Sequence, residues 1–154
     1  MNFKIEPAQQ ADIPRLVDLL NDLFGGELDF TADATHQARG LELLLAADSP
    51  GDRQVVAVAR DDTGQAVGMA SAQIVVSTAE GALSAWIEDV VVHQDYRRQG
   101  IGRQLLEYLV EWAKARGATR VQLVADQENA NADFFYRALG WQTTQLIVRR
   151  RSTG

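Results

Sequence analysis

A glycine-rich segment, YRRQGIGRQLL at residues 96–106, most constrains how this chain can fold. It follows an apolar run that ends in Val90–Val92, and it precedes a stretch with apolar residues at helical spacing. Glycine lets a backbone approach a ligand closely, and the first amides of a helix have no partner within that helix. The pattern therefore predicts a strand, a tight loop and a helix whose N-terminus can bind an anion, typically a phosphate.

The common nucleotide-binding motifs do not fit this loop. A dinucleotide loop would need a third glycine where Leu105 stands, and a P-loop needs a Gly-Lys-Ser/Thr sequence that the chain lacks. A turn that simply starts a helix also explains the glycines. The loop taken alone therefore does not assign a ligand.

Hydrophobic periodicity and turn signals predict the rest of the fold. The expected strands are 3–6, 54–59, 67–77, 84–92, 121–125 and 141–149, and the expected helices are 13–24, 35–47, 100–116 and 131–139. Hairpin-linked strands followed by a late strand–helix–strand unit predict an α/β protein. We expect a single domain over residues 1–154, with a mixed, mostly antiparallel sheet of six to seven strands flanked by about four helices.

Charge and composition limit the function. A formal net charge of −6 argues against nucleic-acid binding and favours a cationic small substrate. The absence of cysteine excludes a thiolate metal site and a cysteine nucleophile, and His36 and His93 lie far apart, so no metal is expected. We also expect no membrane span and a cytoplasmic protein, because no long apolar run and no signal-peptide pattern are present.

Two motifs together carry a family resemblance. The first is R-x-x-G-x-G at Arg97–Gly102, which follows the acidic pair and valines of residues 88–92. The second is N-x-x-A-x-x-x-Y-R-x-x-G-W at residues 129–141. Their combination resembles the GNAT superfamily of acyl-CoA-dependent N-acetyltransferases. The resemblance implies a GNAT-like fold, acetyl-CoA as the acyl donor and a primary amine as the acceptor, which attacks directly in a ternary complex.

The resemblance also implies how the coenzyme binds. The loop amides would bind the pyrophosphate, the arginines can add charge, the valine strand would bond the pantetheine through its backbone, and one asparagine would hydrogen-bond the coenzyme. The implied residues are Val90, Val91, Val92, Arg97, Arg98, Gln99, Gly100, Ile101, Gly102, Arg103 and Asn129. Structural roles explain several of them equally: buried valines in a strand, a solvent-facing Arg98 and a helix cap at Asn129.

Three residues are candidates for the chemistry. Tyr136 matches the tyrosine that serves this family as the acid for the leaving thiolate, and its alternative is core packing. Glu88 is our first choice as the base, directly or through a water, and Asp89 is the second. Strand alternation should send these two carboxylates to opposite faces of the sheet. An acid pair that only forms ion pairs is the structural alternative.

Other functions fit the same sequence. The fold can serve as a non-catalytic acyl-CoA sensor or interaction module, and it can acetylate proteins or peptides instead of small amines. Family members are often dimers, so a homodimer is an expectation that the sequence itself does not determine.

Overall fold

The computed structural model describes residues 2–27, 29–46 and 53–154, and the chain divides into two compact units. The first unit spans Met1–Leu123 and the second spans Val124–Gly154. Over the described residues, all strands and three of the α-helices belong to the first unit. The single domain expected over residues 1–154 stays a prediction.

The first unit is built on a mixed sheet with the strand order β1-β2-β3-β4-β5. The strands are β1 (Lys4–Pro7), β2 (Gln54–Arg60), β3 (Ala66–Ser77), β4 (Ala82–Val92) and β5 (Ala118–Leu123). The first four pair antiparallel with their neighbours, and β5 pairs parallel with β4. The mixed, mostly antiparallel α/β fold is confirmed, but the described residues form five strands rather than the six to seven predicted.

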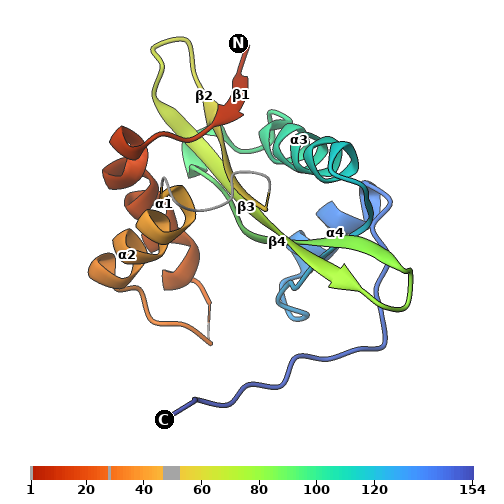
Figure 1. Cartoon of the computed structure of the whole chain (residues 1–154). Helices are drawn as coiled ribbons and strands as arrows, with labels where there is room; N and C mark the ends of the chain where they lie inside the picture. Colours follow the sequence, from red (N-terminus) through yellow and green to blue (C-terminus); the bar gives the residue numbers. More distant parts are fainter. Residues whose placement is uncertain (1, 28, 47–52) are drawn as a thin grey trace. The chain divides into compact units, whose positions relative to one another are not determined.

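Helices cover both faces of this sheet (Figure 1). One face carries α1 (Ile13–Gly25) and α2 (Ala34–Leu45), and the other carries α3 (Ile101–Ala115). Two short 3-10 helices, η1 (Gln10–Asp12) and η2 (Gln94–Tyr96), precede α1 and the glycine-rich loop. Because both faces are covered, the middle of β2 is buried on both sides.

Two apolar layers hold the helices to the sheet. The α1–α2 side is packed with Leu16, Leu19, Leu20, Leu41, Val56, Val58, Ala66, Met69 and Val91. On the other side, α3 buries Ile101, Leu105, Leu106, Leu109, Trp112 and Ala113, which follow the helical spacing of the sequence. The core therefore fixes the start of α3, and with it the end of the glycine-rich loop, against the sheet.

The second unit contains one described helix, α4 (Ala130–Ala138). The strand predicted at residues 141–149 is wrong, because this segment has no regular secondary structure. A strand needs a neighbour that pairs with its backbone amides and carbonyls. No strand of the described sheet pairs with this segment.

None of the described helices combines the length and the apolar character that crossing a membrane requires.

Candidate functional site

The glycine-rich loop takes an unusual backbone path between β4 and α3. Two residues adopt the left-handed conformation, Arg98 with φ 62° and Gly100 with φ 81°. Gly100 is also the N-cap of α3, and no side chain caps the helix there. Left-handed residues within a short loop turn successive amides towards one side and form a concave anion site.

The backbone amides of residues 98–103 accordingly lack acceptors. No backbone carbonyl within the described parts of the chain accepts a hydrogen bond from them, although the neighbouring amides of Tyr96 and Gln104 are bonded. The partial positive charge of the α3 N-terminus adds to these donors. Backbone donors at the start of a helix are the usual partners of a phosphate.

The side chains around the loop are mostly exposed. Arg97 and Arg98 are exposed, as are Gln99 and Arg103. The Nε atom of Arg97 donates to the backbone carbonyl of Val92 at 3.0 Å. Arg97 therefore ties the loop to the end of β4, a contact that the sequence did not indicate.

Within the described sheet, the last part of β4 pairs with a strand on only one side. The pairing between β4 and β5 ends at Ile87 and Leu123, whereas β4 continues to Val92. Val91 is buried in the core on the α1–α2 side, and Val90 and Val92 are partly buried. Residues 88–92 thus present an edge without a β5 partner, and an extended amide-containing ligand can add to such an edge.

A β-bulge lies between Glu88 and Val91 and includes the second candidate carboxylate, Asp89. Glu88 pairs with Ser71 and Val91 pairs with Met69, so β4 holds one more residue than β3 over this stretch. Asp89 takes up the extra length with φ 58°, a left-handed conformation that aspartate tolerates better than most residues. Strand alternation therefore breaks at Asp89 and does not by itself determine the faces on which the two carboxylates lie.

Asp89 has the chemistry of a base near neutral pH. Burial, with smaller contributions from the nearby carboxylates of Glu88 and Glu27, raises its pKa from 3.8 to about 6. Glu88 is exposed. Both residues stay candidates, but the environment of Asp89 favours it over our first choice, because a base works best with a pKa near the working pH.

The second unit contains Asn129 and Tyr136. The Oδ1 atom of Asn129 accepts from the amide of Ala132 at 3.1 Å, so this residue caps α4 and its amide NH₂ can still donate. The Tyr136 ring packs edge-on against Phe135 and Trp141, and burial raises the pKa of its phenol. A protonated phenol is the form that can act as an acid.

Comparison with known sequences decides the family. The profile of the acetyltransferase (GNAT) family matches residues 13–141. The chain belongs to this family. The match includes the glycine-rich loop, the acidic pair and the motif in residues 129–141, so the resemblance in the sequence is confirmed.

Similar GNAT proteins differ in their acceptors. An aminoglycoside N(6′)-acetyltransferase type 1 from Acinetobacter genomosp. 13 is 32% identical over 94 residues, covering 59% of this chain and 64% of the relative. The [ribosomal protein bS18]-alanine N-acetyltransferase of Escherichia coli is 36% identical over 66 residues, or 43% of each chain. Matches to the first curated relatives span between 32% and 64% of their length.

A solved structure extends the comparison to the whole fold. Aminoglycoside 6′-N-acetyltransferase AAC(6′)-Iy, in complex with a bisubstrate analogue that contains CoA, superposes with a TM-score of 0.80 at 21% identity. The superposition covers 100% of both chains. At this identity the likeness shows the fold.

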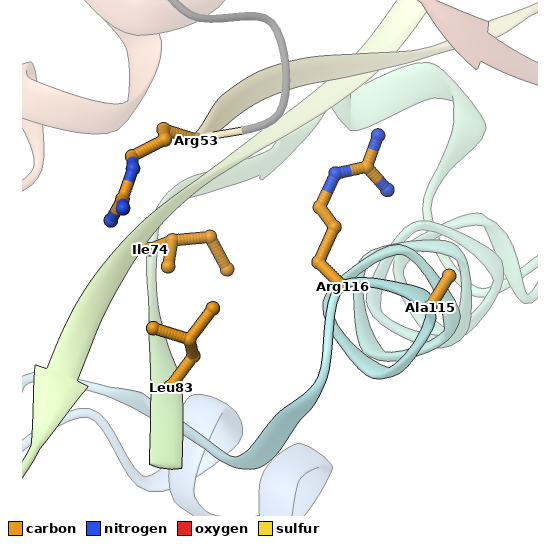
Figure 2. A pocket seen from close by; sticks show the side chains of 5 residues that line it. All are labelled: Arg53, Ile74, Leu83, Ala115 and Arg116. Carbon is orange, nitrogen blue, oxygen red and sulfur yellow. The ribbon is translucent and has the colours of Figure 1, made fainter.

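Figure 2 shows a pocket whose lining residues lie outside the glycine-rich loop. Arg53, Ile74, Leu83, Ala115 and Arg116 line it, and its volume is about 390 Å³. Two of these residues are at the C-terminal end of α3, whereas the loop is at its N-terminal end, about 22 Å away for a helix of 15 residues. The pocket contains none of the predicted site residues. Across the described residues, no three His, Asp or Glu side chains are grouped as metal ligands.

Proposed function

We propose that this GNAT-family chain transfers an acetyl group from acetyl-CoA to the primary amine of a small molecule, by direct attack in a ternary complex. The carrying observation is the row of amides at residues 98–103, for which the described residues supply no backbone acceptor, at the N-terminus of α3 and next to the open edge of β4. A pyrophosphate needs donors such as these amides, and the amides of pantetheine need an open strand edge. The two features lie next to each other, as the two groups do along the extended coenzyme.

The glycine-rich loop and the end of β4 would bind different parts of the coenzyme. The amides of residues 98–103 would hold the pyrophosphate, and the exposed Arg98 can add charge. The backbone of residues 90–92 would bond the pantetheine amides. Asn129 would donate from its amide NH₂ while its oxygen caps α4.

Asp89 is proposed as the base. The ammonium group of the acceptor gives a proton to the Asp89 carboxylate, directly or through a water. The neutral nitrogen then bonds to the thioester carbonyl carbon, and the carbon–sulfur bond breaks with its electron pair on sulfur. Tyr136 is proposed to protonate the departing thiolate, as the family resemblance implies. The bonded nitrogen loses its second proton, through water, to the Tyr136 phenolate, and Asp89 returns its proton to solvent, which leaves coenzyme A and the acetylated amine.

The negative charge around the base supports a cationic acceptor. Glu88 and Glu27 are close enough to Asp89 to raise its pKa, and the whole chain carries a formal net charge of −6. An ammonium group is attracted to such a region before it loses its proton. The aminoglycoside acetyltransferase relative acts on a substrate class of this charge, which supports a small polyamine-like or amino-sugar acceptor.

Acetylation of a protein N-terminus is the second candidate. The similarity to the ribosomal protein alanine acetyltransferase favours it, although the match covers 43% of that relative. A peptide acceptor uses the same amine chemistry. The two candidates therefore differ in the acceptor alone, and a direct comparison of acceptors separates them.

Free-thiol release from acetyl-CoA tests the proposal against a panel of amino sugars, polyamines and N-terminal peptides. Turnover with a small amine supports the first candidate, and turnover with peptides alone supports the second. Coenzyme binding by calorimetry without any turnover would support a sensor and overturn the catalytic roles. Tyr136→Phe should lower kcat with coenzyme affinity preserved, and Tyr108→Phe on α3 is the matched control.

A further inference from the structure

Two segments far apart in the sequence meet next to the phosphate-binding loop. The hydroxyl of Tyr96, in η2, donates to Oδ2 of Asp61 at 3.2 Å. Asp61 belongs to the turn between β2 and β3, and Tyr96 directly precedes Arg97. The bond thus connects the β2–β3 turn to the first residue of the loop.

Asp61 is held in place by its own turn. Its Oδ1 atom accepts from the amide of Thr63 at 2.9 Å, from the Thr63 hydroxyl at 2.6 Å and from the amide of Gln65 at 3.1 Å. The backbone of the turn closes with a bond from the Asp61 amide to the Gln65 carbonyl. The other carboxylate oxygen is therefore a fixed acceptor for Tyr96.

Aromatic contacts fix the Tyr96 ring as well. Phe3 lies edge-on to it with ring centroids 6.1 Å apart, and His93 lies edge-on at 5.9 Å. The Tyr96 amide also donates to the His93 carbonyl at 2.9 Å. The ring, the hydroxyl and the backbone amide of Tyr96 all have partners, whereas the loop that follows has amides with no backbone acceptor among the described residues.

The loop needs such an anchor. Arg98 is left-handed although it is not a glycine, a conformation that costs roughly 1–2 kcal/mol. The amides of residues 98–103 gain no acceptor within the described chain in exchange. A loop of this kind keeps its shape without ligand only where its ends are held, and Tyr96 is two positions before Arg98, the first left-handed residue of the loop.

We propose that Tyr96 and Asp61 form a positioning pair that holds the phosphate-binding loop in its ligand-ready conformation. The inference rests on the proposed function for its ligand, the coenzyme pyrophosphate. Neither residue contacts the reacting atoms. Their effect is to lower the ordering cost of coenzyme binding, so it acts on coenzyme affinity and not on the chemical step.

Tyr96→Phe removes the hydroxyl and keeps the aromatic contacts. We expect the dissociation constant for coenzyme A, measured by calorimetry, to rise about three- to tenfold, the usual effect of one lost hydrogen bond. The kcat at saturating acetyl-CoA and the KM for the amine should not change. Tyr108→Phe, which removes the hydroxyl of a partly buried tyrosine on α3, should leave all three values unchanged. A second variant, Asp61→Asn, keeps an acceptor oxygen and should weaken coenzyme binding less than Asp61→Ala.

Amide order parameters of residues 97–102 in the ligand-free protein separate this inference from the proposed function. They should fall in Tyr96→Phe and stay unchanged in Tyr108→Phe. Unchanged order parameters and unchanged affinity would overturn the positioning pair and leave the proposed function standing. If the unaltered protein did not bind coenzyme A, the proposed function would fail, and a fall in the order parameters would still support the pair as the loop's anchor.

Discussion

The Ser71 hydroxyl donates to the backbone carbonyl of Glu88 at 3.1 Å, directly before the bulge at Asp89. Ser71 is 1% exposed, and its bond to Glu88 is partly shielded from water. It holds the strand on the near side of the bulge while Met69 and Val91 pair on the far side. The bond therefore helps to set the direction of the proposed base.

Ser71→Ala should lower stability and catalysis together. We expect a loss of about 0.5–1.5 kcal/mol in the free energy of unfolding, because a partly buried carbonyl loses a donor. The kcat should fall at least about threefold, because a displaced base works less well, while coenzyme affinity is kept. Urea unfolding and steady-state kinetics measure the two effects.

Ser84→Ala is the control for that variant. Ser84 is also buried in β4, and its hydroxyl donates to the carbonyl of Arg120 on β5 at 3.2 Å. The pairing of β4 with β5 ends at Ile87, before the bulge. A similar loss of stability with an unchanged kcat is expected. Equal kcat losses in both variants would show that Ser71 has no special relation to the site.

The pH dependence of kcat distinguishes the two carboxylates. Activity should fall as the pH drops through about 6, because Asp89 then becomes protonated. Asp89→Asn should lower kcat by about 10²–10⁴ and remove this fall in activity, the acidic limb of the pH profile. Glu88→Gln should keep the limb and move it to lower pH, because a negative charge that raises the pKa of Asp89 is gone. A limb that vanishes in Glu88→Gln and persists in Asp89→Asn would assign the base to Glu88.

Asp89 should also make stability depend on pH. Its pKa is raised on folding, so its contribution is fully present below pH 3.8 and is lost as the pH rises through about 6. The rise in the pKa of Asp89 from 3.8 to about 6 corresponds to at most about 3 kcal/mol in the free energy of unfolding. Asparagine stays neutral and tolerates the left-handed backbone.

Urea unfolding at pH 4.5 and pH 7.5 measures this effect. The free energy of unfolding of Asp89→Asn minus that of the unaltered protein should be larger at pH 7.5 than at pH 4.5. The carboxyl of Asp12 has its pKa lowered by Arg60, so its contribution has the opposite sign and is lost towards low pH. Because Asp12 is present in both proteins, it cancels in the difference. A difference that does not change with pH would show that Asp89 is not buried as a carboxylate.

Local patterns predicted the strands and helices of the first unit and the position of its glycine-rich loop. Glycine spacing located residues 100–102, and apolar periodicity located α3. The bulge at Asp89 had no such signal, because it depends on the register between β3 and β4 and not on local preference. The tie from Tyr96 to Asp61 was equally hidden, since it joins residues 35 positions apart.

The wrong strand at residues 141–149 has a related cause. Leu146, Ile147 and Val148 have the β-branched and apolar character of a strand, yet they are exposed. Residues with strand propensity form a strand only where another strand pairs with them. The fold supplies that strand, so local sequence does not predict it. The raised pKa of Asp89 also depends on distant groups, because Glu27, after α1, contributes to it.

Gly68, on β3, is needed for the contact between the sheet and the start of α3. A Cβ atom there would lie 3.2 Å from Cγ2 of Ile101, 3.2 Å from the Val91 carbonyl and 3.3 Å from Cδ1 of Leu105. Gly68→Ala should therefore cost about 1–3 kcal/mol in the free energy of unfolding, measured with urea. Ile101 is the first residue of α3, so coenzyme affinity should fall in the same variant.

Gly25→Ala serves as the control, because a Cβ on Gly25, at the end of α1, would have nothing within 4 Å. Alanine should be neutral or stabilising there, with coenzyme affinity unchanged. If Gly68→Ala lowered stability without any effect on coenzyme binding, the packing contact would stand. The position of the α3 N-terminus would then not be what limits coenzyme affinity.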